Sequence, residues 1–61
     1  MMYFKVCFQY STTTYCVNIA EAENVEQVED HYKKYSWFCV VPATVYDMNE
    51  AKKKGMPIIH L

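Results

Sequence analysis

The chain has 61 residues, of which 52% are hydrophobic, and its formal net charge at pH 7 is −1. This composition is globular and excludes the disordered and fibrous classes. A chain of this length forms one domain, here residues 1–61, and buries only about 60% of the surface that its unfolded form exposes. Because of this net charge we expect no general attraction to nucleic acid or to an anionic membrane. All six basic residues are lysines, so the chain also lacks the arginines that make bidentate contacts to guanine and phosphate.

Two segments near the N-terminus, residues 3–10 and 13–20, alternate apolar and polar side chains. This pattern predicts a β-hairpin. The side chains expected to share one buried face are Phe4, Val6, Phe8, Tyr10, Tyr15, Val17 and Ile19. The hairpin has either a two-residue turn at 11–12 or a four-residue loop at 11–14, and both alternatives keep these side chains together.

A helix is expected to begin after Asn24, because Asn24 and Gln27 have the spacing of a capping box. The residues that follow at helical spacing form an apolar stripe of about three turns: Val25, Val28, Tyr32 and Tyr35. We therefore expect this stripe to pack on the buried face of the hairpin.

Further strands are predicted in the second half of the chain. Trp37–Val41 and residues 43–46 form one expected strand, interrupted by Pro42. Proline cannot donate a hydrogen bond to a sheet, so this strand is expected to lie at an edge or to bulge there. Ile58–Leu61 is predicted as a short closing strand.

A second, shorter helix is expected to begin at Asp47, with Glu50 at the capping-box position, and to end at Gly55. The predicted fold class is thus α+β with the element order ββαβαβ. We expect two layers: a four-stranded, largely antiparallel sheet with one long helix packed on it, and one short helix.

The possible metal ligands and nucleophiles are Cys7, Cys16, Cys39, His31 and His60. Structural zinc sites usually contain closely spaced cysteine pairs, and this chain has none. Neither histidine has a partner evident in the sequence that would orient it as a catalytic base. We therefore expect packing thiols, no metal, no cofactor and no enzymatic activity.

The predicted location is the cytoplasm. The odd number of cysteines excludes a fully paired disulfide framework, and the first residues do not resemble a signal peptide. Thiols remain reduced in the cytoplasm.

The second face of the predicted sheet is too apolar to be left in water. It is expected to carry Tyr3, Cys7 and Cys16, with either Trp37, Cys39 and Val41 or their neighbours. One alternative is that the second helix covers part of it. A protein partner is expected to cover the rest, or a homodimer forms through this face or through an edge strand. The expected binding residues are the aromatic anchors Tyr3, Trp37 and Tyr46 and an acidic rim of Glu26, Glu29 and Asp30.

The basic cluster Lys52, Lys53 and Lys54 has two interpretations. Cations in the last turn of a helix complement its dipole, which is the structural interpretation. Three lysines also bind a phosphate backbone in a salt-dependent way. Nucleic-acid binding through this cluster is therefore the alternative function.

Two segments, Ala22–Val28 and Lys54–Ile59, follow an N-terminal hairpin in an order that resembles small single-domain accessory proteins. Proteins of this kind are encoded by bacterial phages and by conjugative elements of gut Firmicutes. Some of them inhibit host defence, including anti-CRISPR proteins that block a CRISPR nuclease. The resemblance implies a stoichiometric binder rather than an enzyme, and it carries over no site residue.

Overall fold

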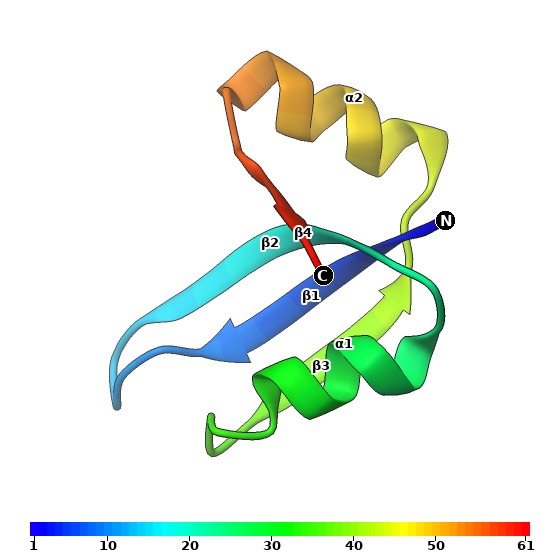
Figure 1. Cartoon of the computed structure of the whole chain (residues 1–61). Coiled ribbons are helices and arrows are strands. Elements are labelled where there is room, and N and C mark those ends of the chain that lie inside the picture. The colour runs from blue at the N-terminus through cyan, green and yellow to red at the C-terminus, as the bar shows by residue number, and fades with distance from the viewer.

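The computed structural model describes all residues, 1–61, as a four-stranded sheet with two helices (Figure 1). In chain order the elements are β1 (Met2–Gln9), β2 (Tyr15–Ala22), α1 (Val25–Tyr32), β3 (Phe38–Pro42), α2 (Val45–Lys54) and β4 (Ile58–His60). The strand order is β3-β1-β2-β4, and only the β2–β4 pair is parallel. The α+β class, the order ββαβαβ and the largely antiparallel sheet are confirmed.

The two helices lie on opposite sides of the sheet (Figure 1), so the sheet is the middle of three layers and the predicted two-layer arrangement is wrong. Their relative lengths differ from the prediction, because α1 has 8 residues and α2 has 10. The first helix ends at Tyr32, since residues 33–37 turn the chain back into β3. Tyr35 nevertheless packs against the core, as its place in the apolar stripe predicts. Neither helix is long and apolar enough to cross a membrane.

The hairpin register is the main departure from the predicted fold. Phe4 pairs with Ala20, which neither predicted loop gives, and residues 10–14 form the loop. This loop has an odd number of residues, whereas both predicted loops have an even number. Since opposite residues of an antiparallel pair share a face, the one-residue shift moves every β2 side chain to the other face. Tyr15, Val17 and Ile19 therefore do not lie with Phe4, and Tyr10 is exposed in the loop, so the prediction is wrong for these four residues.

The face under α1, which we call the inner face, carries the main core. Its buried residues are Phe4, Val6, Phe8, Ala20, Ala22, Val28 and Tyr32. Cys16 also packs against this core, so its predicted place on the second face is wrong. Asn18 is on the inner face too, because it pairs directly with Val6. Its side-chain amide donates a hydrogen bond of 2.9 Å to the Tyr32 hydroxyl, which satisfies a polar group beside the core.

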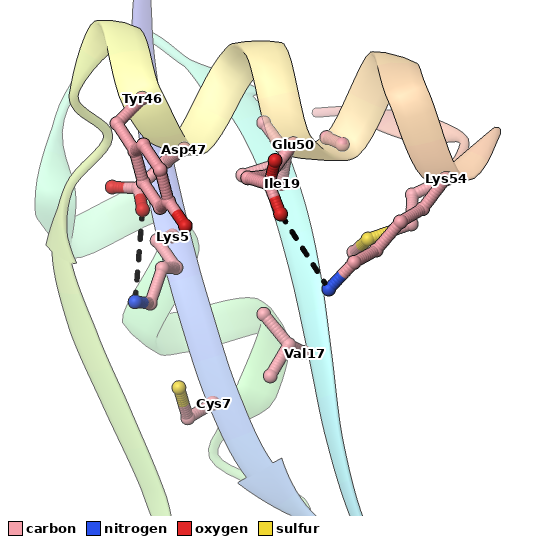
Figure 2. A pocket seen from close by; sticks show the side chains of 10 residues that line it. Lys5, Cys7, Val17, Ile19, Tyr46, Asp47, Glu50 and Lys54 are labelled. Carbon is pink, nitrogen blue, oxygen red and sulfur yellow. Dashed lines mark ion pairs between the residues drawn. The ribbon is translucent and has the colours of Figure 1, made fainter.

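The opposite face, which we call the outer face, carries the odd-numbered side chains of β1, β2 and β3. Ile19 and Ala51 of α2 are both buried on this side of the sheet. The helix crosses the strands near Lys5 and Ile19 and leaves Val17 further from it (Figure 2). α2 thus covers one half of the outer face.

The second helix, α2, begins at Val45, two residues before Asp47, the predicted N-cap. Thr44, not Asp47, is the N-cap, and β3 ends at Pro42 instead of running on to residue 46. The Thr44 hydroxyl accepts from the Asp47 backbone N–H at 3.1 Å, and the Asp47 carboxylate accepts from the Thr44 N–H at 2.9 Å. These reciprocal bonds form a capping box with aspartate in the place of the usual glutamate. Gly55 ends the helix in a left-handed conformation, as predicted.

Candidate functional site

The half of the outer face that α2 does not cover is apolar and accessible. We call these side chains the open patch: Cys7 and Gln9 of β1, Tyr15 and Val17 of β2, Trp37, which precedes β3, and Cys39 and Val41 of β3. None of them is charged. Tyr15 keeps 65% of its surface exposed and Trp37 keeps 47%. Contiguous exposed apolar surface of this kind marks an association site more often than scattered apolar side chains do.

An aromatic pair forms one end of the open patch. Trp37 and Tyr15 lie on either side of Gln9, and their rings meet edge to face with centroids 5.9 Å apart. The Gln9 backbone N–H donates to the Trp37 carbonyl at 2.9 Å, and its side-chain oxygen accepts from the Ser36 hydroxyl at 3.1 Å. The pair is therefore positioned by the sheet before any partner binds. Ordered aromatic side chains of this type dominate binding energy at protein interfaces.

Two thiols form the middle of the open patch. Cys7 lies directly opposite Cys39 on β3 and opposite Val17 on β2. Cys39 is exposed, Cys7 is partly exposed, and both are free. Cys16 points to the inner face, so the sheet does not bring the three cysteines together. No group of three or more His, Cys, Asp or Glu side chains is arranged to hold a metal ion.

A groove of about 280 Å³ lies beneath α2 and adjoins the open patch. Its floor is made by Cys7, Val17 and Ile19, and α2 forms its wall (Figure 2). Cys7 and Val17 belong to both the groove and the open patch, so the two form one continuous surface. The groove is therefore a recess into which a partner that covers the open patch can insert a side chain.

Ion pairs balance the charges along the groove (Figure 2). Lys5 Nζ lies 3.7 Å from Asp47 Oδ1, and Lys54 Nζ lies 4.0 Å from Glu50 Oε1. Hydrogen bonding from the Thr44 backbone holds the pKa of Asp47 below its ordinary value, and Lys5 adds to this effect. Asp47 is thus ionised at neutral pH. The groove consequently selects for neither sign of charge.

A polar cluster of Glu21, His60 and Tyr3 occupies the other end of the outer face. His60 Nδ1 lies 2.7 Å from Glu21 Oε1 and joins β4 to β2. Hydrogen bonding to Tyr3 and then to His60 lowers the pKa of Glu21, and the same bond to Glu21 raises the pKa of Tyr3. Tyr3 is therefore engaged within the fold. It also lies at the opposite end of β1 from Gln9, which adjoins Trp37.

The structure separates the residues that the sequence predicted as one binding site. Trp37 is in the open patch, and Tyr46 lines the groove. The acidic rim, Glu26, Glu29 and Asp30, is exposed on α1, on the far side of the sheet. Asp30 pairs there with Lys33 at 2.7 Å, and hydrogen bonding to Lys33 lowers its pKa. These acids therefore do not border the aromatic residues, and their contact with a partner stays a prediction.

The three consecutive lysines do not form one basic surface. Successive residues of an α-helix are rotated by about 100°, so Lys52, Lys53 and Lys54 point in different directions. Lys54 lines the groove beside Glu50, and Lys52 lines a second hollow beside Met48. Nucleic-acid binding through this cluster stays a prediction, and the three lysines do not form a contiguous basic patch that would support it.

Tyr15 is the functional candidate that the sequence analysis missed, because the hairpin parity assigned it to the core. A predicted loop of odd length would have placed Tyr15 beside Trp37.

Comparison with known proteins finds no matching family model, no matching curated protein and no matching solved structure. Function is therefore inferred from the geometry of this chain.

Proposed function

We propose that the chain is a non-enzymatic protein-binding module whose partner docks on the open patch. The observation that carries this proposal is the ordered Trp37–Tyr15 pair beside uncharged, accessible side chains. Interface cores are depleted in charge and rich in Trp and Tyr, which matches this composition.

The open patch and groove together define the partner's chemistry. The contacting surface of the partner is apolar at its centre, because any buried charge would lie unpaired against Val17 and Cys39. A protruding apolar side chain of the partner enters the groove above Ile19. Lys5 and Asp47 already neutralise each other there, so they select for no charge.

We further propose that the module acts in the cytoplasm as an inhibitor encoded by a phage or mobile element. Its target is then a host defence protein such as a CRISPR nuclease. The resemblance of residues 22–28 and 54–59 and the three free thiols support this narrower proposal. A DNA-cleavage assay with a CRISPR nuclease tests it: inhibition is expected at one chain per nuclease, and undiminished cleavage at a large excess contradicts it.

The binding proposal is tested by affinity capture on the immobilised chain, with the retained protein identified and its Kd measured. Trp37→Ala is expected to weaken binding by about 10- to 30-fold, the effect of removing an aromatic hot spot. Tyr10→Ala is the matched control, because Tyr10 is an exposed tyrosine in the hairpin loop, outside the open patch. Equal loss in both variants, or unchanged binding by Trp37→Ala, contradicts docking on the open patch.

A further inference from the structure

The outer edge of β3 carries unpaired backbone groups. In the β1–β3 ladder, the Gln9 N–H donates to the Trp37 carbonyl and the Ala43 N–H donates to the Tyr3 carbonyl, both at 2.9 Å. The odd-numbered residues of β3 therefore bond to β1. By the alternation of an antiparallel ladder, the N–H and C=O groups of the even-numbered residues point away from the sheet.

These outward positions are Phe38, Val40 and Pro42. Pro42 lacks an N–H, and at an outward position this absence removes no bond to β1. Phe38 and Val40 each present a free donor and a free acceptor. The edge is thus a template to which another extended strand can add.

No charged side chain protects this edge. Residues 36–43 are all uncharged, whereas exposed edges are commonly protected by lysines, prolines, bulges or very short strands. Of these devices β3 has only Pro42, which lies at its C-terminal end and leaves Phe38 and Val40 free. The opposite edge of the sheet is protected in this way, because β4 has only 3 residues. A two-fold axis at β3 would therefore place no charged residue of the strand against another. An uncharged edge is therefore compatible with a second copy of itself.

We propose that a second copy of this chain adds to β3 in antiparallel orientation and joins the two sheets into one. The two Cys39 residues face each other at the two-fold axis. In this register Phe38 of each copy lies opposite Val40 of the other, and each such pair exchanges two N–H···O bonds. A register centred on Val40 would instead place Phe38 opposite Pro42 and leave the Phe38 carbonyl unpaired.

Side-chain pairing favours the same register. On the outer face, Trp37 of one copy lies opposite Val41 of the other. On the inner face, Phe38 lies opposite Val40. Both are pairs of an aromatic with a β-branched side chain, the combination that stabilises neighbouring antiparallel strands. The two open patches then become one surface that crosses the dimer axis. The inference does not depend on the partner proposed above, because the backbone edge of β3 makes the dimer bonds, although Trp37, Cys39 and Val41 belong to both the open patch and the dimer seam.

Light scattering after size exclusion tests the dimer at chain concentrations up to about 1 mM. The native chain is expected to double its mass, and Val40→Pro to remain monomeric because it loses an outward N–H. Val40→Ala is the matched control: it loses the same side chain, keeps the N–H and is expected to dimerise. A native chain that stays monomeric overturns the proposal, as does a Val40→Pro variant that dimerises like Val40→Ala.

Thiol trapping tests the register and does not require Val40→Pro to fold. Facing residues at a non-hydrogen-bonded position have Cα atoms about 4.5 Å apart, within the range of a disulfide. Diamide oxidises two thiols to a disulfide and takes up their two electrons and two protons. It is expected to give a covalent dimer of the native chain and of the Cys7→Ser variant through Cys39, and no covalent dimer of Cys39→Ser on a non-reducing denaturing gel. Equal covalent dimer from Cys39→Ser, or none from the native chain, overturns the register.

Discussion

The side-chain amide of Asn18 donates a hydrogen bond of 2.9 Å to the hydroxyl of Tyr32, and this bond joins β2 to α1. Tyr32 is buried in the main core, and Asn18 lies on the same face of the sheet. A polar side chain is tolerated beside an apolar core when its hydrogen bonds are made. The bond therefore explains how an asparagine lies on the inner face while Val17 and Ile19 lie on the outer one.

Tyr32→Phe should reveal what this bond contributes. The variant keeps the ring but leaves the partly buried Asn18 amide without its acceptor, so we expect a loss of about 1 to 3 kcal/mol in the free energy of unfolding. Urea denaturation measures this loss. Tyr10→Phe, a change at an exposed ring, is the control and is expected to be neutral. A Tyr32→Phe variant as stable as this control would show that the bond contributes nothing.

Short-range patterns predicted those parts of the fold whose causes are local. The Asn24 cap forms as expected, with the Gln27 N–H donating to the Asn24 side chain at 2.9 Å. Val28 and Tyr32 of α1 are buried in the core, as their spacing predicts. The left-handed end of α2 falls at Gly55. Each of these features depends on residues within a few positions of one another.

Hairpin parity could not be predicted in the same way, because it depends on whether the loop length is odd or even. Val17 and Ile19 are apolar, and a sheet with one covered face would place them beneath α1. The chain instead covers part of each face, so β2 needs apolar residues on both. Ile19 is buried on the face under α2, whereas Ala20 and Ala22 are buried on the face under α1.

The candidate site was predicted only in part for the same reason. Trp37 was predicted as an anchor because aromatic residues dominate binding hot spots, but its neighbour Tyr15 was assigned to the core. The Glu21–His60 contact joins residues 39 positions apart, and it exists only because β4 pairs with β2. Local spacing contains no signal for such a contact.

A second prediction concerns Thr44, the N-cap of α2. Thr44→Ala removes the hydroxyl that accepts from the Asp47 N–H, so we expect a loss of about 0.5 to 2 kcal/mol in the free energy of unfolding. Thr44→Ser retains the hydroxyl and should keep most of the stability. Thr13→Ala, in the exposed hairpin loop, is the neutral control. If Thr44→Ala matched Thr13→Ala in urea, the helix would not begin at this cap.

Acid should destabilise the fold partly through Glu21. Its pKa is lowered from the ordinary value of 4.5 by hydrogen bonding to Tyr3 and then to His60. A lowered folded-state pKa contributes stability that is present above the ordinary value and is lost as the pH falls through the folded value. We expect the melting temperature to decrease as the pH drops below about 4.5, and the melting temperature of Glu21→Gln to depend less on pH. Thermal melts by circular dichroism across this range measure both.

Some acid dependence will remain in Glu21→Gln, because the pKa values of Asp30 and Asp47 are lowered as well. Asp30→Asn is the comparison variant, since it removes the Lys33 pair on α1 and leaves the Glu21 cluster intact. Superimposable acid profiles for Glu21→Gln and the native chain would exclude a role of this carboxylate in stability.

Two residues on the same face of β2 test whether α2 covers only half of the outer face. Ile19 is 1% exposed beneath α2, whereas Val17, two positions earlier, is 44% exposed. Truncating a buried isoleucine leaves a cavity and costs about 2 to 5 kcal/mol, so Ile19→Ala should destabilise the fold strongly. Val17→Ala leaves no enclosed cavity and should cost less than about 1 kcal/mol. Urea denaturation of the two variants measures the difference.

Binding of the proposed partner should depend on Val17, because Val17 lies in the open patch. A folded Val17→Ala chain is expected to bind the partner more weakly than the native chain. Comparable destabilisation by Ile19→Ala and Val17→Ala would mean that Val17 is covered within the single chain and does not belong to the open patch.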